Sequence, residues 1–366
     1  MSKIFLLGDS HIALGYPNNT DKWHKVHIEY FEEFLIPLLK EKVKKGDIII
    51  HLGDLYDNRN IIPINLLNYG INIVEQIANI APLHILVGNH DCWHKTSSNI
   101  TTLKPFMYIP NVFVYDKTTV IEYNGHKLCM MPYIEKKEEQ ISLIKENLDC
   151  SYLFCHSDLN GAKMHLTSAA HKNNDKIDID EFSNFKKVYS GHIHILDRHK
   201  NFTFVGNNFE MDRNDIDNQK GLFILDTNKE LELFIPNNIS PKFKKIYVNK
   251  EEDIDLLTEN VAKDWVDLFV SNNLLVSNRK LRRKIEGVLQ NGSFASVEYI
   301  DDISIKEEIV EDITANENLT INLDYDEYIK NYIDVQKYEI DKVKNGVLKV
   351  FNEVIEIYKE SKKKLD

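Results

Sequence analysis

The sequence predicts an α/β fold with a second, strand-rich part. Short apolar runs typical of strands alternate with helix-like segments between Lys3 and Val87. Downstream of Val112, further strand-like runs include two that are separated by an Asn124–Gly125 turn. The composition is typical of a globular protein with a large core, because 43% of the 366 residues are hydrophobic and 28% are charged. It excludes a disordered or fibrous protein.

The first part of the chain contains strands and helices in alternation. Helical spacing of apolar residues covers Tyr30–Lys45, which Gly46 closes, and then Ile64–Ile80. The strand-like runs around these helices are Lys3–Leu7, Asp47–Leu52 and His84–Val87. This order of elements predicts the α/β part of the fold.

The second part is dominated by strands and ends at a break in composition. Strand-like runs at 119–123 and 126–131 flank the Asn124–Gly125 turn, and others follow at 202–206, 221–226 and 229–235. These runs predict a second sheet. Phe234–Pro241 places two prolines around an Asn-rich stretch, which is typical of a boundary between domains.

Three regions follow from this break. We expect a main domain at residues 1–236, a small cap domain at 242–318 and a final helix at 325–361. In the final helix, apolar positions from Ile329 to Tyr358 lie mostly three or four residues apart, which indicates an apolar stripe. Such a stripe packs either on its own domain or on a partner.

Charge and cysteine content limit the classes of function. The chain has 45 Lys and Arg against 57 Asp and Glu, and its net charge of −12 argues against a protein that coats nucleic acid by charge alone. Four cysteines without a C-x-x-C pair indicate buried thiols in a reduced compartment. The apolar stretches fall short of the roughly 20 residues that cross a bilayer, and a secretory signal is lacking. We therefore expect an intracellular protein without a membrane partner.

Five clusters of polar residues each follow a strand-like run. In chain order they are Gly8–His11, Gly53–Asp57, Gly88–Asp91, His156 and Gly191–His194. Because α/β sheets build their sites from loops at the carboxyl ends of strands, we expect the five clusters to converge. One Gly-Asp or His-x-His cluster alone is common in turns and on surfaces, but all five in this order favour a metal site.

The kinds of side chain in these clusters indicate the metals and the chemistry. Carboxylate, imidazole and amide oxygen suit manganese, iron, zinc or magnesium, and thiolates are absent from the set. Two such ions roughly 3.5 to 4 Å apart can clamp a phosphate, activate a shared water and stabilise the leaving oxygen. This arrangement needs one bridging carboxylate and terminal ligands on each side, and the clusters contain both.

The motifs resemble those of the calcineurin-like metallophosphoesterases. The family pattern is D-x-H, G-D-x-x-D, G-N-H-D, a lone histidine and G-H-x-H, and it is complete between Asp9 and His194. In detail, the sequences at Asp9–Gly15, Gly53–Arg59 and Lys220–Gly221 resemble those of DNA double-strand-break repair nucleases of the SbcD type and their T-even phage relatives. The resemblance implies a four-layer α/β/β/α sandwich with a small α+β cap domain and a C-terminal helix. It also implies the cytoplasm of a bacterial cell or of a phage-infected host.

Carried over position by position, the resemblance implies ligands for two divalent ions, with manganese as the first choice and magnesium or iron as alternatives. The implied ligands are Asp9, His11 and His194 for one ion, Asn89, His156 and His192 for the other, and Asp54 as the bridge. His90 would be the outer acid that stabilises or protonates the leaving oxygen, oriented by Asp91.

The resemblance also implies DNA as the substrate. In the cap, residues 279–284 hold five positive charges, and Lys280, Arg282 and Arg283 are the expected phosphate contacts, although a solvated helix face accounts for such a cluster equally well. Asp57 and Arg59 would also face the substrate. Asp57 stands where some relatives carry a histidine, so the balance between exonuclease and endonuclease activity stays open.

The expected function is that of a two-metal DNA nuclease subunit in a recombination or repair complex. The resemblance implies an SbcC-type ABC ATPase with a coiled coil as the partner of the C-terminal helix, and a homodimer. This chain has no Walker motif, so ATP hydrolysis would belong to the partner. The alternatives are a metallophosphatase or cyclic-nucleotide phosphodiesterase, and a catalytically silent scaffold. The scaffold is disfavoured because every expected ligand and His90 are present.

Overall fold

The computed structural model describes most of the chain up to residue 300. The described residues are 2–13, 21–94, 97–164, 166, 168, 173, 175–248, 250, 253, 264–271, 283, 285 and 294–300. The chain divides into two compact units, Met1–Asp301 and Asp302–Asp366, and the second lies wholly outside the described residues. The expected helix at 325–361 belongs to that second unit. The domain bounds 1–236 and 242–318 stay predictions.

The first sheet has six strands, and its central strands are parallel. Their order is β14 (Leu231–Pro236), β13 (Gly221–Asp226), β1 (Lys3–Leu7), β2 (Ile48–His51), β3 (Leu83–Leu86) and β6 (Val112–Tyr115). Strands β1, β2, β3 and β6 run parallel, while β13 is antiparallel to both β1 and β14. All residues of β2 and β3 are buried, as is typical of parallel strands that are covered on both faces.

The second sheet also has six strands. Their order is β11 (Asp197–His199), β12 (Phe202–Phe204), β10 (Lys187–Ser190), β9 (Tyr152–Cys155), β8 (His126–Met131) and β7 (Thr119–Tyr123). The predicted Asn124–Gly125 turn joins β7 to β8, and both of its residues have positive φ. The sequence pattern grouped β13 and β14 with this second sheet, but they belong to the first. The reason is long-range pairing, which sets Phe5 of β1 opposite Ile224 of β13.

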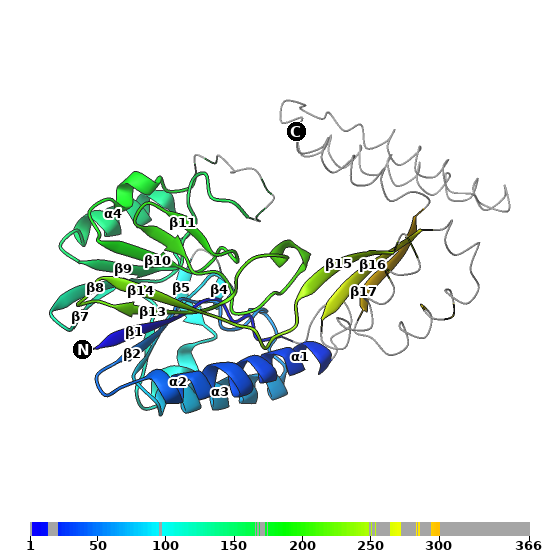
Figure 1. The fold of residues 1–366 in the computed structure, drawn as a ribbon. Coiled ribbons are helices and arrows are strands. Elements are labelled where there is room, and N and C mark those ends of the chain that lie inside the picture. Colours follow the sequence, from blue (N-terminus) through cyan, green and yellow to red (C-terminus); the bar gives the residue numbers. More distant parts are fainter. Residues whose placement is uncertain are drawn as a thin grey trace, which may run out of the picture. The chain divides into compact units, whose positions relative to one another are not determined.

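Apolar side chains fill the space between the two sheets. Leu6 and Ile50 of the first sheet share one buried cluster with Met130 and Phe154 of the second. The outer face of the first sheet packs on α1 (Asp21–Ile28), α2 (Ile36–Lys42) and α3 (Ile64–Ala78), and that of the second packs on α4 (Lys137–Glu146). The layers follow the order α/β/β/α, which confirms the predicted sandwich (Figure 1).

The first helical region is longer than predicted. It begins at Asp21, continues from α1 through a π-helical stretch η1 (Glu29–Leu35) and ends with α2 at Lys42. The backbone N–H of Ile36 donates to the carbonyl of Phe31, five residues earlier, just before Pro37, which has no N–H to donate. Val43 is extended, so the helix stops three residues before the predicted end at Lys45.

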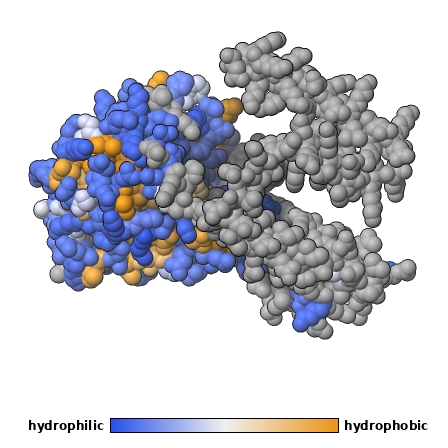
Figure 2. All heavy atoms as spheres, turned by 90° about the horizontal axis from the view of Figure 1, so that it is seen from above, coloured by the Kyte–Doolittle hydropathy of each residue, from blue (hydrophilic) through white to orange (hydrophobic). Residues whose placement is uncertain are grey.

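The remaining elements are short. A two-stranded ribbon consists of β4 (Cys92–His94) and β5 (Ser97–Thr101), and a parallel three-stranded sheet consists of β15 (Phe243–Val248), β16 (Trp265–Ser271) and β17 (Phe294–Ile300). Single 3-10 turns are η2 (Lys104–Tyr108), η3 (Ile179–Phe182) and η4 (Arg213–Asp215). Figure 2 shows one face, where the coloured surface is mostly hydrophilic with small hydrophobic patches. Within the described ranges, no helix is both long and apolar enough to cross a membrane.

Candidate metal centre

The five predicted clusters lie at the carboxyl ends of five parallel strands. Following β1, β2, β3, β9 and β10 in turn, the side chains are Asp9 with His11, then Asp54, Asn89, His156, and His192 with His194. Three of these strands belong to the first sheet and two to the second. The site is therefore built where the ends of the two sheets meet.

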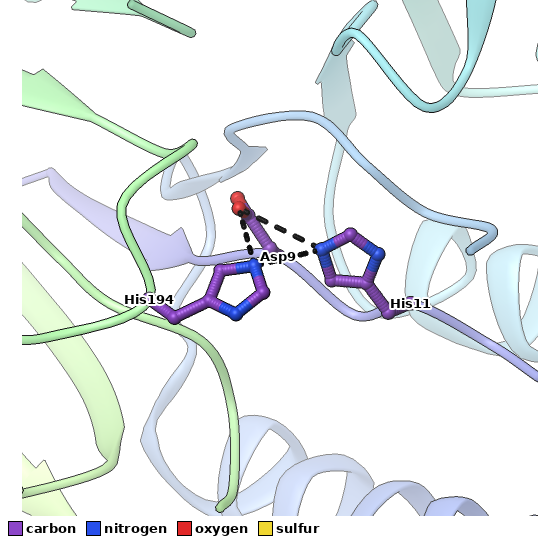
Figure 3. Close-up of side chains that lie close together, drawn as sticks. All are labelled: Asp9, His11 and His194. Atoms are coloured by element: carbon purple, nitrogen blue, oxygen red, sulfur yellow. Dashed lines mark hydrogen bonds and ion pairs between the residues drawn. The ribbon is translucent and has the colours of Figure 1, made fainter. Parts of the chain in front are cut away.

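The first group joins Asp9 and His11, which follow β1, to His194, which follows β10. The Nε2 atoms of His11 and His194 are 3.0 Å apart. Asp9 Oδ2 lies 4.0 Å from Nε2 of His11 and 3.9 Å from Nε2 of His194. Figure 3 shows these two rings and the Asp9 carboxylate gathered around one point. Asp9 is fully buried, and His11 is nearly so.

A second group is centred on the amide oxygen of Asn89. Asn89 Oδ1 lies 2.9 Å from Nε2 of His156 and 2.7 Å from Nδ1 of His192. Asp54 lies between the two groups, because its Oδ2 is 3.3 Å from Nε2 of His156 and 3.8 Å from Nε2 of His11. The other carboxylate oxygen of Asp54 accepts the backbone N–H of His90 at 2.7 Å.

Two glycines permit this close approach of the loops around Asp54. A Cβ atom on Gly88 would lie 2.2 Å from Asp54 Oδ1, and a Cβ atom on Gly53 would lie 2.5 Å from Nδ1 of His156. Gly53 also has a φ of +108°, which L side chains rarely adopt. Glycine before Asp54 and before Asn89 is therefore a steric requirement of the site.

Three residues of the two groups have an unusual backbone conformation. The φ angles of His11, Asp54 and His192 are 43°, 54° and 79°. Positive φ costs energy for residues other than glycine and is concentrated at functional sites. The surrounding structure thus holds these three side chains in directions that a relaxed loop would not give them.

The geometry of the donor atoms fits divalent cations. Two ligands that lie about 2.1 Å from one ion and at right angles to each other are about 3.0 Å apart, which is the separation of the His11 and His194 nitrogens. Two buried carboxylates, Asp9 and Asp54, face the same site, and a cation there would offset their mutual repulsion. The set offers only nitrogen and oxygen atoms, as manganese, iron, zinc or magnesium prefer.

Burial and neighbouring charges shift the pKa values within the site. Burial raises the pKa of Asp9 to about 7, and it lowers the pKa of His192 and of His194 to about 3. Burial also opposes the charged forms of His11 and His156, but nearby carboxylates outweigh it and raise both pKa values to about 9. A cation bound beside the buried carboxylates would favour their charged forms, so metal binding is expected to release protons from the site.

Residues 2–196, more than half of the chain, match the family described as calcineurin-like phosphoesterase. The chain belongs to the calcineurin-like phosphoesterase family. This result confirms the resemblance inferred from the five motifs and makes the protein a metallophosphoesterase, a hydrolase whose family uses divalent metals.

Two viral proteins are similar in sequence to this phosphoesterase. Exonuclease subunit 1 of Enterobacteria phage T4 is 30% identical over 245 residues, which cover 64% of this chain and 68% of that protein. Putative phosphoesterase 244L of Invertebrate iridescent virus 6 is 29% identical over 215 residues, covering 56% of this chain and 69% of that protein. A solved archaeal phosphodiesterase aligns with 64% of this chain and 99% of its own at 13% identity, with a TM-score of 0.32.

In this phosphoesterase, the contacts of His90 differ from those expected. His90 Nδ1 donates to the backbone carbonyl of Asp57 at 2.6 Å, so Asp57 orients the ring in place of Asp91. The Asp91 carboxylate is fully buried and accepts backbone N–H bonds from Asp54, Leu55 and Gly88 at 2.8 to 3.1 Å. Because its carboxylate accepts these three backbone N–H bonds, Asp91 holds the Asp54 loop in place rather than the ring of His90.

Two residues that support the ligands, His51 and Tyr133, were not predicted from the sequence. His51 accepts the N–H of Gly53 at Nδ1 and meets Ser10 Oγ through Nε2 at 2.7 Å, which ties the Asp54 loop to the Asp9 loop. The ring of Tyr133 stacks on His192 with centroids 5.9 Å apart. Only the position of His51 at the end of a buried strand could have indicated its role, and nothing in the local sequence marks Tyr133.

The expected DNA contacts are only partly described. Asp57 is half exposed and lies 3.3 Å from Nδ1 of His11, and Arg59 is half-buried. Arg283 is exposed, while Lys280 and Arg282 fall outside the described residues. Substrate roles for all five stay predictions.

Proposed function

We propose that this phosphoesterase is a manganese-dependent, two-metal DNA nuclease and the nuclease subunit of a recombination or repair complex. The observation that carries the proposal is the presence of two nitrogen-and-oxygen ligand groups with the Asp54 carboxylate between them. Similarity to a phage exonuclease subunit supports a nuclease rather than a phosphatase.

Each ligand group would hold one ion. In this proposal the ligands are Asp9, His11 and His194 for the first ion, Asn89, His156 and His192 for the second, and Asp54 for both. When bound, two divalent ions neutralise the phosphate and activate the attacking water. The buried protein groups fix the ligands in advance, so that little reorganisation is needed when charge develops on the substrate.

His90 would act on the leaving oxygen. Its Nδ1 is held by the carbonyl of Asp57, which leaves Nε2 as the nitrogen available to the substrate. Because Nδ1 keeps its own proton, Nε2 can donate a proton to the oxygen that departs from phosphorus only when the ring is in its imidazolium form. Asp57 is thereby a positioning residue through its backbone, and its carboxylate beside His11 Nδ1 orients a ligand of the first ion.

The decisive experiment is digestion of linear double-stranded DNA by the full chain with Mn²⁺. The His90→Asn variant should bind Mn²⁺ as the wild type does but lose about 100-fold or more in rate, as expected for loss of a general acid. His94→Asn is the matched control, because His94 is an exposed histidine in the neighbouring strand β4 and should not affect the rate.

A small phosphodiester should be assayed in parallel to separate the possible outcomes. Hydrolysis of both DNA and the small ester supports the nuclease. If the small ester alone is hydrolysed, a phosphatase or cyclic-nucleotide phosphodiesterase replaces the proposal for the isolated chain. Absence of bound Mn²⁺ and of all hydrolysis would instead indicate the silent scaffold.

We further propose that an SbcC-type ABC ATPase with a coiled coil binds the chain through residues 325–361. The phage relative is named as a subunit, which supports a complex with another protein. The apolar stripe between Ile329 and Tyr358 supports a helix that docks on a partner. Truncation after Asn318 should abolish capture of the ATPase while the variant still hydrolyses the small ester. Capture by the truncated chain would refute this role.

A homodimer is the second proposed assembly, and exposed apolar residues indicate where it would form. Ile61, three residues before α3, and Ile64, the first residue of α3, are 71% and 77% exposed, and Tyr108 at the end of η2 is 85% exposed. Both segments contact Tyr56, whose hydroxyl donates to Leu67 and whose ring stacks on Phe106. Ile64→Glu should give a monomer in light scattering, whereas an unchanged mass for a dimeric wild type would exclude this surface.

A further inference from the structure

The segment Asn207–Lys220, between β12 and β13, contacts the first ligand group at both of its ends. At its start, the N–H of Asn207 donates to the carbonyl of His194 at 3.1 Å, and the N–H of Asn208 donates to the carbonyl of Asp9 at 3.3 Å. The side-chain amide of Asn208 also donates to Ser10 Oγ at 2.8 Å. The loops that carry Asp9, His11 and His194 are therefore bonded to this one segment.

At its other end, the segment is fixed by a buried ion pair. Lys220 is 5% exposed, and its Nζ donates to the carbonyl of His194 at 2.7 Å and to Asp215 Oδ1 at 2.5 Å. The second oxygen of Asp215 accepts from the side chain of Asn207 at 3.1 Å and from the N–H of Met211 at 2.8 Å. These bonds close the segment on itself. Because Lys220 bonds to both Asp215 and the carbonyl of His194, a displacement of Asp215 would also displace His194.

The middle of the segment contacts the three-stranded sheet. Arg213 forms a two-pronged ion pair with Asp267 of β16, in which Nη2 and Oδ1 are 2.8 Å apart. Three residues earlier, Glu210 accepts the backbone N–H of Phe243, the first residue of β15, at 2.6 Å. Asp267 is 4% exposed, so this pair is largely shielded from solvent on the carboxylate side.

A second path connects the same face of β16 with the ligand loops. Trp265, two residues before Asp267 and hence on the same side of the strand, packs on Trp23 of α1 with centroids 6.1 Å apart. Phe209 contacts both Trp23 and His27, and His27 Nε2 lies 3.0 Å from the carbonyl of His11. One face of one strand is thus linked to both sides of the first ligand group.

We propose that the segment Asn207–Lys220 couples the position of the three-stranded sheet to the Asp9, His11 and His194 group, with Arg213 and Asp267 as the positioning residues that make the link. The inference rests on the metal centre proposed above. Its consequence is directional: a molecule that moves the sheet changes the first ion position, while the group around Asn89 has none of these bonds to the segment. The sheet would then act as a sensor of the substrate or partner that binds it.

The test is the affinity of each ion position for Mn²⁺, measured on the full chain from the electron paramagnetic resonance signal of free Mn²⁺. An Asn89→Ala parent leaves the first position as the reporter, and a His11→Ala parent leaves the second. Arg213→Met or Asp267→Asn should weaken Mn²⁺ binding about tenfold in the Asn89→Ala parent. Loss of a group that supports a metal ligand typically weakens metal binding by about 10-fold to 100-fold, and tenfold is the lower end of that range. Neither substitution should change Mn²⁺ binding in the His11→Ala parent.

Two further variants separate coupling from a general loss of stability. Arg213→Lys keeps the cation and should retain most of the affinity. Lys186→Met removes an equally exposed cation, which pairs with Glu230 at 2.5 Å and lies outside the segment, and should have no effect. Thermal unfolding of each variant checks that Asp267→Asn, which also removes the buried charge, is folded.

Each outcome decides a different claim. Parent-like affinity of both Arg213→Met and Asp267→Asn at the first position overturns the coupling but leaves the metal centre intact. Equal weakening at both positions also overturns it, because the effect would then be a general one. A parent with Asn89→Ala that binds no Mn²⁺ although the chain is folded would remove the proposed first ion position and this inference with it.

Discussion

At the scale of single residues, hydrogen bonds determine which nitrogen of each histidine is available. His156 Nδ1 lies 2.8 Å from the carbonyl of Leu52 and so must carry the proton, which leaves Nε2 for a metal ion. In His51 the assignment is reversed, because Nδ1 accepts the N–H of Gly53 and Nε2 donates to Ser10. His51 is 3% exposed, and burial lowers its pKa to about 3, so it stays neutral.

His51→Leu should weaken both the fold and the metal centre. The substitution leaves the buried N–H of Gly53 without its acceptor, so the free energy of unfolding should fall by about 1–3 kcal/mol. Loss of the bond to Ser10 loosens the loop between Asp9 and His11, and Mn²⁺ affinity should fall about tenfold. Denaturant unfolding and Mn²⁺ titration measure the two effects.

His84→Leu is the matched control for this variant. His84 is also a buried histidine, but its Nδ1 bonds to the hydroxyl of Tyr115 within the first sheet, away from the ligand loops. It should lose stability and keep its Mn²⁺ affinity. If His51→Leu binds Mn²⁺ like the wild type, His51 is only a core residue.

Residue types and order alone predicted which side chains come together, because each stands directly after a strand. The partners beyond the ligands could not be predicted in this way. His90 bonds to the backbone carbonyl of Asp57 and not to the carboxylate of Asp91. Every residue has a backbone carbonyl, so the residue type at a position cannot indicate such a partner. Lys220 reaches His194 across 26 residues of chain, and no local pattern encodes that distance.

At the scale of elements, glycines in the turns after β2 and β3 determine how closely the loops of the site approach one another. Gly88→Ala should abolish binding of at least one Mn²⁺ ion, since its Cβ would lie 2.2 Å from Asp54 Oδ1 and 2.4 Å from the backbone nitrogen of Asp54. Isothermal titration calorimetry measures the loss directly.

Gly125→Ala, in the turn between β7 and β8, provides the comparison. Gly125 has a φ of +75°, but a Cβ added there would have no atom within 4 Å. Only backbone strain of about 1 kcal/mol is therefore expected, with no change in Mn²⁺ binding. Equal Mn²⁺ binding by Gly88→Ala and wild type would show that the loops can move apart without loss of the site.

The elements themselves were predicted well where apolar residues repeat regularly. Strands β1, β2 and β3 lie within two residues of their predicted ends, and α3 begins at the predicted Ile64. The start of the first helix was missed because the apolar repeat is weak there, and one of its buried positions is occupied by the polar residue His27. The sheet to which β13 and β14 belong depends on pairing with β1 across most of the chain, which local periodicity does not contain.

At the scale of the whole molecule, an acidic chain is proposed to cleave an acidic polymer. The net charge of −12 gives no general attraction to DNA, so contacts must come from local basic residues and from the metal ions. In the proposed coupling, the three-stranded sheet β15–β17 would sense a bound molecule while the ligand groups hold the metal ions. Such an arrangement would suit DNA as the substrate, because the energy of DNA binding would then depend on correct placement of the DNA rather than on the total charge of the protein.

The measurement that tests the central claim most directly is a crystal structure of the full chain with Mn²⁺, with anomalous scattering used to locate the ions. We predict two anomalous peaks roughly 3.5 to 4 Å apart, one against Asp9, His11 and His194, the other against Asn89, His156 and His192, with Asp54 between them. A single peak, or peaks away from Asp54, would contradict a two-metal centre and with it the proposed nuclease mechanism.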